Sequence, residues 1–225
     1  MNSEYRYEIK FILDNAGLSD AMQWLYGDTT ANKAYNDRRV NSIYFDNVDF
    51  SSVIDNLAGI SERNKLRLRW YGNQNNSLPF FEVKKRKGRL GYKTSYPIKS
   101  LRENLLNINM DKITSKCIND LATNNIVFDE HLTPTLQVNY EREYYETYNG
   151  IRITIDQNIQ FSDTQLHTQL NENHFFSYPN NVMEIKFEPS MKEEVSELIR
   201  PLHITPKRHS KYLIGLATLG YVVYI

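Results

Sequence analysis

The stretch LRLRWYG at residues 66–72 decides how the rest of this sequence is interpreted. Apolar and cationic residues alternate along it: Leu66, Arg67, Leu68, Arg69 and Trp70. Neighbouring side chains of a strand point to opposite faces, so the stretch predicts a strand with one apolar and one cationic face. The cationic face either meets solvent or points at something anionic.

Strand-like stretches dominate the sequence. They are residues 5–13, 39–47, 65–72, 79–87, 91–98, 134–147, 150–161 and 181–188, and Asn149-Gly150 is a strong hairpin signal. Helical patterns occupy residues 19–27, 49–59, 100–124, 191–200 and 210–221, with Ser19 or Asp20 as the expected N-cap of the first. This mixture favours an α+β fold with an antiparallel sheet, in a single domain over residues 1–225.

Charge recurs at every second position in several of these stretches. Besides the two arginines, the pattern comprises Arg6, Glu8 and Lys10; Glu82, Lys84 and Arg86; Arg152, Thr154 and Asp156; and Glu184, Lys186 and Glu188. Any one of these strands could present its charges to solvent. Together they favour a sheet closed into a barrel, with the charged face lining a lumen and the apolar face under helices.

A lumen rich in arginine and lysine needs an anionic guest, because gathered like charges are otherwise costly. Phosphate chains suit it, since arginine donates bidentate hydrogen bonds and lysine supplies a compact charge. Interspersed glutamates would hold a divalent cation that in turn binds phosphate oxygens. The pattern therefore predicts a tunnel for a phosphate-rich anion.

Composition and motifs exclude several other classes. The formal net charge is zero at pH 7, so no global field attracts nucleic acid, and no nucleic-acid partner is expected. The sequence has no phosphate-binding loop, dinucleotide fingerprint or hydrolase elbow, and its histidines are too scattered for a zinc cluster. Residues 213–225, the longest apolar stretch, are too short to span a bilayer. With Cys117 as the single cysteine, a cytoplasmic location is expected.

Eight segments resemble, in the same order, those of VTC domains. They are YRYEIKF (5–11), VNSIYFDN (40–47), RNKLRLRWYG (63–72), FFEVKKRKG (80–88), VNYEREYY (138–145), IRITID (151–156), VMEIKF (182–187) and HSKYLIG (209–215). VTC domains are the catalytic modules of vacuolar transporter chaperone polyphosphate polymerases and their bacterial relatives. They belong to the triphosphate tunnel metalloenzyme superfamily, together with CYTH-type triphosphatases. The resemblance implies an eight-stranded antiparallel β-barrel that forms a tunnel, with flanking helices.

The resemblance also implies a reaction, in which the γ-phosphoryl group of ATP is transferred to a growing polyphosphate chain with Mn²⁺ or Mg²⁺ as cofactor. The implied catalytic residues are Lys10, Arg67, Arg69, Lys84, Arg142, Lys186 and Lys211. Arg208 and Ser210 are implied to bind phosphate, and Glu184 to bind the metal. The charge alternation adds Arg6, Arg86 and Arg152 as phosphate-binding residues, and Glu8 and Glu82 as metal ligands.

The sequence departs from its relatives in two places. CYTH triphosphatases begin with E-x-E-x-K, and Arg6 stands here in place of the first glutamate, which favours the polymerase branch. Eukaryotic VTC enzymes carry a further arginine upstream of RLRW, for which Arg63 or Lys65 is the expected substitute.

Two alternatives to the polymerase remain open at this point. A triphosphatase would use the same cations and metal with water as the acceptor, and a sensor would bind polyphosphate or nucleotide without turnover. Relatives often act beside membrane proteins that receive the chain, so a membrane-protein partner is a further expectation.

Overall fold

The computed structural model describes residues 5–72, 77–88, 90–103, 105, 107–128, 131–170 and 174–223. Its helices are α1 (Asn15–Gly27), α2 (Ser51–Leu57), α3 (Met110–Ala122), α4 (Lys192–Leu198) and α5 (Lys211–Thr218). Its strands are β1 (Tyr7–Leu13), β2 (Asn32–Asp46), β3 (Glu62–Tyr71), β4 (Phe80–Lys87), β5 (Leu90–Pro97), β6 (Thr133–Glu146), β7 (Arg152–Ser162), β8 (Phe176–Ser177) and β9 (Asn181–Phe187). All eight predicted strands are present, and the fold is α+β.

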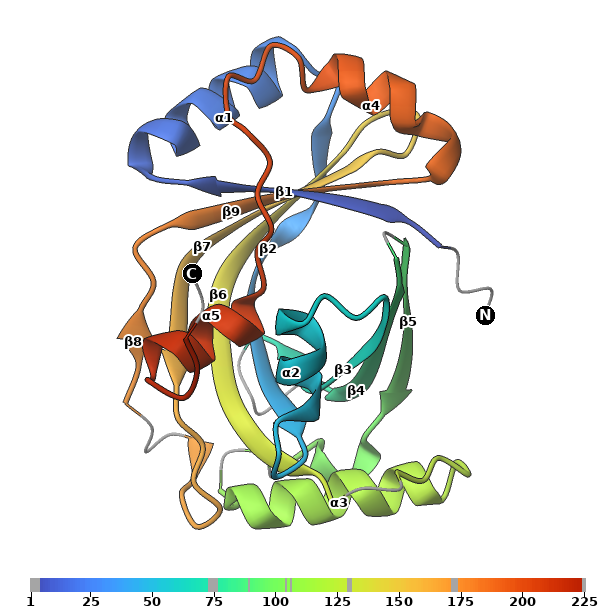
Figure 1. Ribbon diagram of the computed structural model, residues 1–225, viewed down its shortest axis with the longest axis vertical. Coiled ribbons are helices and arrows are strands. Elements are labelled where there is room, and N and C mark those ends of the chain that lie inside the picture. The colour runs from blue at the N-terminus through green and yellow to red at the C-terminus, as the bar shows by residue number, and fades with distance from the viewer. Residues whose placement is uncertain are drawn as a thin grey trace.

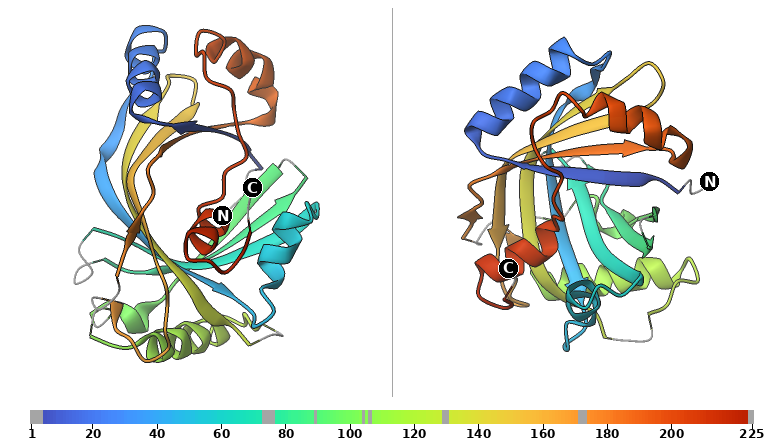
Figure 2. Two further views of the ribbon diagram at one scale, coloured as in Figure 1. Left: turned by 60° about the vertical axis from the view of Figure 1, so that its left-hand side comes forward. Right: turned by 45° about the horizontal axis from the view of Figure 1, so that its top comes forward.

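The strands form one strongly curved antiparallel sheet (Figure 2, left). Its order is β1-β9-β7-β6-β2-β3-β4-β5, and the short β8 pairs with β7. The edge strands approach each other at one bridge, where the backbones of Arg6 and Gly91 exchange hydrogen bonds of 3.3 and 3.4 Å. The described residues show no continuous ladder between β1 and β5, so the sheet encircles a lumen without closing into a complete barrel.

The alternation in LRLRWYG places its two faces as predicted. Leu68 and Trp70 are fully buried on the outer face, in a cluster with Phe81 and with Ile113 of α3. Leu66 packs against the same cluster. The arginines of β3 therefore point to the concave side of the sheet.

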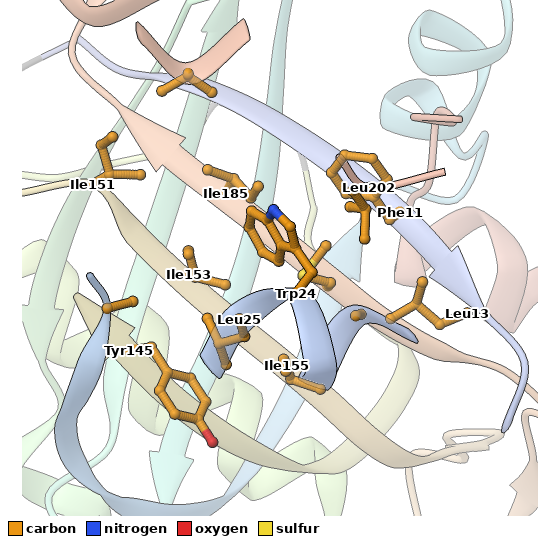
Figure 3. Packing of buried hydrophobic residues seen from close by; sticks show 14 of the residues in the cluster. Phe11, Leu13, Trp24, Leu25, Tyr145, Ile151, Ile153, Ile155, Ile185 and Leu202 are labelled. Carbon is orange, nitrogen blue, oxygen red and sulfur yellow. The ribbon is translucent and has the colours of Figure 1, made fainter. Parts of the chain in front are cut away.

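A second outer cluster lies under α1 and α4 at the opposite end of the molecule from α3 (Figure 1). Ile153 and Ile155 of β7 and Ile185 of β9 pack there against Trp24 of α1 (Figure 3). The Trp24 indole also donates a hydrogen bond of 2.9 Å to the backbone carbonyl of Leu198, which ties α1 to the end of α4.

The last helix, α5, lies inside the curve of the sheet rather than outside it (Figure 2, left). Its Tyr212 and Leu216 pack with Val138 of β6. Gly215 permits this close approach, because a Cβ at that position would lie 2.5 Å from the Leu136 side chain. Residues 199–210 lead from α4 across the open side to α5, and Lys207 N donates to the Lys10 carbonyl at 2.9 Å on the way.

The helix predictions were correct in kind and wrong in detail. The predicted helix at 100–124 is a 3-10 turn (Lys99–Leu101) followed by α3. The predicted N-cap at Ser19 or Asp20 is wrong, because α1 begins at Asn15 and the Asp14 carboxylate accepts a hydrogen bond of 2.7 Å from Gly17 N.

Candidate functional site

A cavity of about 1050 Å³ occupies the concave side of the sheet. Strands β1, β2, β3, β4, β6 and β9 contribute to its wall, α2 contributes to its rim, and the segment 206–211 brings the amino end of α5 into it. On β3 and β4 the charged lining residues alternate with the buried apolar residues Leu68, Trp70, Phe81 and Val83, whereas on β6 and β9 the buried Tyr140 and Phe187 also line the cavity. The cavity wall is thus the charged face that the sequence pattern predicts.

The wall is strongly cationic although the whole chain has no net charge. Its inner cations are Lys10, Lys65, Arg67, Arg69, Lys84, Arg142, Lys186 and Lys211. The carboxylates that pair with them are Glu8, Glu82, Asp156 and Glu184. Each carboxylate therefore faces two of these cations on average, and the excess positive charge suits an anionic ligand.

Glu82 holds the two arginines of β3 in place. Its carboxylate lies 2.6 Å from Arg67, 2.5 Å from Lys93 and 3.8 Å from Arg69. Burial raises the pKa of Glu82, but Arg67, Arg69 and Lys93 outweigh burial and hold that pKa well below its usual value. Glu82 is 2% exposed and does not line the cavity. Its position is that of a counter-ion behind the arginines, which does not favour the metal role predicted for it.

On the opposite wall, Asp156 holds Arg142 and Lys211 in place. Both of its oxygens accept hydrogen bonds from Arg142, at 2.5 and 2.7 Å, and one also accepts from Lys211 at 2.6 Å. Asp156 is fully buried, and Arg142 and Lys211 hold its pKa well below its usual value against the effect of burial. Because Lys211 belongs to α5, this ion cluster fixes the helix to β6 and β7.

The third ion cluster contains the two carboxylates that line the cavity, Glu8 and Glu184. Glu8 lies 2.8 Å from both Lys10 and Lys84, and Glu184 lies 2.7 Å from Lys186. Burial raises the pKa of Glu8, but Lys10, Lys84 and Lys186 outweigh burial and hold that pKa well below its usual value. The Glu8 carboxylate is therefore ionised at neutral pH beside these lysines.

A divalent cation fits this carboxylate pair. Glu8 and Glu184 are close enough to affect each other's pKa, and the buried Oε1 of Glu184 has the Lys186 ammonium 2.7 Å away. Among the residues described, no group of three or more Asp, Glu, His or Cys residues is arranged to hold a metal. Mg²⁺ is commonly bound by only one or two carboxylates, with phosphate oxygens and water completing its shell.

The structure brings most of the predicted residues together and separates three. All seven predicted catalytic residues line the cavity, as do Arg86, Arg208, Ser210, Glu8 and Glu184. Arg152 does not, because it lies at the start of β7, half exposed, with its guanidinium 3.3 Å from Glu146. Arg6 lies at the sheet edge opposite Gly91 and is not among the lining residues. Glu82 lies behind the residues that line the cavity.

Several lining residues were not among the predicted site residues. The Tyr44 hydroxyl accepts a hydrogen bond from Arg67 at 3.3 Å, and the Tyr140 hydroxyl accepts one from Arg69 at 2.9 Å. Lys65, expected from the sequence only as one of two substitutes for an upstream arginine, lines the cavity and shares the parity of Arg67. Only the folded chain shows that Asp156 is the buried partner of Arg142 and Lys211 on the far wall.

No helix in the described part of the chain is long and apolar enough to cross a bilayer.

Comparison with known proteins agrees with this geometry. The model of the VTC domain family matches residues 5–220. Similar solved structures include PH1819 from Pyrococcus horikoshii (13% identity, TM-score 0.56, covering 95% of this chain and 99% of that one). They also include HpAC1 from Hippeastrum, described as having a dominant triphosphatase activity (14% identity, TM-score 0.53, covering 97% of each chain). At these identities the likeness shows the fold. No curated protein matches the sequence.

Proposed function

This chain belongs to the VTC domain family, and from that premise we propose that it is a polyphosphate polymerase. In the proposed reaction, the γ-phosphoryl group of ATP is transferred to the end of an inorganic polyphosphate chain inside the cavity. The observation that carries this proposal is the cavity wall, with its eight inner cations, four paired carboxylates and the metal-compatible pair Glu8 and Glu184.

The chemistry requires little beyond positioning and charge neutralisation. A terminal oxygen of the chain forms a bond to the γ-phosphorus, the bond from that phosphorus to the β–γ bridging oxygen breaks, and ADP leaves. Arg67, Arg69 and Arg142 are already fixed by buried carboxylates, so they would donate to phosphoryl oxygens without reorganising. Lys10, Lys84 and Lys186 would exchange their glutamate partners for phosphate oxygens.

A Mn²⁺ or Mg²⁺ ion held by Glu8 and Glu184 would neutralise charge on the same phosphoryl groups when bound. The three lysines beside these carboxylates keep the pair ionised, as metal binding requires. We expect the cytoplasm as the compartment, where ATP is the donor, and a membrane-protein partner as the receiver of the chain.

A triphosphatase is the second candidate, since one protein of similar fold is described as having that activity. The same cavity would then serve water as the acceptor. Arg6 in place of a first glutamate favours the polymerase, because it removes one metal ligand of the hydrolytic pattern.

The test is to incubate the purified chain with ATP and Mn²⁺ or Mg²⁺, with and without a short polyphosphate primer, and to resolve the products on a gel stained for polyphosphate. ADP with a ladder of long chains supports the polymerase. ADP with orthophosphate alone would replace it by the triphosphatase, and tight binding without turnover would leave a sensor.

A further inference from the structure

Lys65 differs from the other inner cations of the cavity. The other seven each have a carboxylate oxygen within 4 Å, as Lys10 and Lys84 do with Glu8. Among the described residues Lys65 forms no ion pair, and its hydrogen-bond partner is the Ser210 hydroxyl oxygen at 2.8 Å. The chain thus places one lysine on the cavity wall without a counter-ion.

Ser210 is held from two sides. It is the N-cap of α5, where its hydroxyl oxygen accepts from Leu213 N at 3.3 Å, and it also accepts from Lys65. A serine oxygen has two lone pairs and one hydrogen, so with both lone pairs used the hydrogen must point away from both donors. The ammonium of Lys65 uses one of its three hydrogens on Ser210, which leaves two.

Cations outnumber anions around this pair. Burial, followed by Lys10, Lys84 and Arg63, lowers the pKa of Lys65 well below its usual value, and Glu8 opposes them. Lys211, Arg208 and the buried His209 line the cavity beside Ser210. The amino end of α5 adds the positive end of a helix dipole. An arriving phosphoryl group would supply the missing negative charge and accept the three spare hydrogens.

We propose that Lys65 and Ser210 act as a coupled pair that binds one phosphoryl group of the substrate at the amino end of α5. Lys65 binds the group directly and also orients the Ser210 hydroxyl toward it. The inference rests on the proposed function only for the class of its ligand, a linear phosphate anion.

The test measures binding of inorganic triphosphate to the full chain by calorimetry, without metal and near neutral pH. Lys65→Met, which keeps the length of the side chain, is expected to weaken binding about tenfold or more, because a charge-assisted hydrogen bond is lost. Lys65→Arg is expected to restore most of the affinity. Lys85→Met, on the exposed outer face of β4, is the matched control and should bind like the wild type.

A double-mutant cycle tests the coupling. Ser210→Ala should weaken triphosphate binding severalfold in the wild type and much less in the Lys65→Met background, because the hydroxyl is no longer oriented there. Thermal unfolding of each variant confirms that it is folded.

Three results would overturn the pair while leaving the proposed function in place: wild-type affinity in Lys65→Met, no recovery in Lys65→Arg, or independent effects in the cycle. Absence of triphosphate binding by the wild-type chain would instead contradict the proposed function, and the pair with it.

Discussion

Glu184 lies on the inner face of β9 and is one of the two carboxylates that line the cavity. Glu184→Ala should lower kcat for ATP turnover by roughly a hundredfold or more, because half of the proposed metal-binding pair is lost. The same change leaves Lys186 without its partner, so metal-free binding of inorganic triphosphate should be unchanged or tighter. Steady-state kinetics and calorimetry separate the two effects.

Glu188→Ala is the control for this prediction, since Glu188 is exposed just beyond the end of β9. Equal losses of turnover and triphosphate binding in Glu184→Ala would show that this carboxylate supports the cavity rather than the metal.

Asp156 is predicted to matter for stability and for its pH dependence. It is the buried partner of Arg142 and Lys211, and removal of one partner from a buried ion cluster costs about 3–5 kcal/mol. Asp156→Asn should therefore lower the free energy of unfolding by that order in urea titrations at pH 7. Arg142 and Lys211 hold the pKa of Asp156 in the folded chain below its ordinary value of 3.8. Its stabilisation is therefore complete above that value and is lost as the pH falls toward the folded pKa.

The wild type should consequently lose stability steeply below about pH 4, whereas Asp156→Asn should show a shallower acid limb. Parallel limbs in the two proteins would mean that other carboxylates dominate acid unfolding, Glu82 being the first candidate because its pKa is also lowered.

The position of a charged residue in the cavity was predictable only in part from the sequence. Alternation gives the face of a strand, and Arg67, Arg69, Lys84 and Glu184 lie on the predicted face. Alternation does not show how deeply a side chain is buried behind its neighbours, or how far along the strand from the cavity it lies. Glu82 has the right parity but is hidden behind the arginines, and Arg152 lies at a strand end beside Glu146.

At the scale of elements, α5 matters because its amino end lines the cavity. Gly215 lets it approach the sheet, since an added Cβ would lie 2.5 Å from Leu136 and 2.8 Å from Phe161. Gly215→Ala should destabilise the chain by about 1–3 kcal/mol through overpacking. It should also weaken triphosphate binding, because α5 carries Ser210 and Lys211 into the cavity.

The matched control is Gly27→Ala at the end of α1, where an added Cβ meets nothing within 4 Å. That change should leave triphosphate affinity unaltered and stability equal or slightly higher. Chemical denaturation and calorimetry measure both quantities, and a Gly215→Ala variant as stable as the wild type would contradict the close packing of α5.

Sequence patterns predicted elements best where one face is apolar. Strand β3 shows its alternation because Leu68 and Trp70 are buried on one face, whereas β5 was found although none of its residues is fully buried. The start of β2 was placed at residue 39 rather than at Asn32, because residues 32–39 are mostly exposed and polar and pair with β6 through bulges. No local sequence pattern indicated that α5 packs inside the curve of the sheet, since an apolar helix packs equally well on either face of a sheet.

At the scale of the whole molecule, the free chain concentrates positive charge in its interior while remaining neutral overall. The cations come from five strands and from α5. The curvature of the sheet brings these elements close together, and the mutual repulsion of the cations opposes that curvature. A multivalent anion that contacts several of them should therefore stabilise the fold as well as bind. At a ligand concentration of about 100 times Kd, linkage gives about 2.7 kcal/mol, or roughly 5–10 °C in Tm for a chain of this size.

Inorganic triphosphate is expected to give this shift in thermal unfolding, and orthophosphate at the same concentration a much smaller one, because it spans fewer cations. The shift should shrink as salt is raised, since the partly exposed lysines on the wall are screened. Lys84→Met should reduce the triphosphate shift, while Lys85→Met, on the outer face of the same strand, should preserve it. Equal shifts with triphosphate and orthophosphate would mean that the cavity binds single anions independently and does not read a phosphate chain.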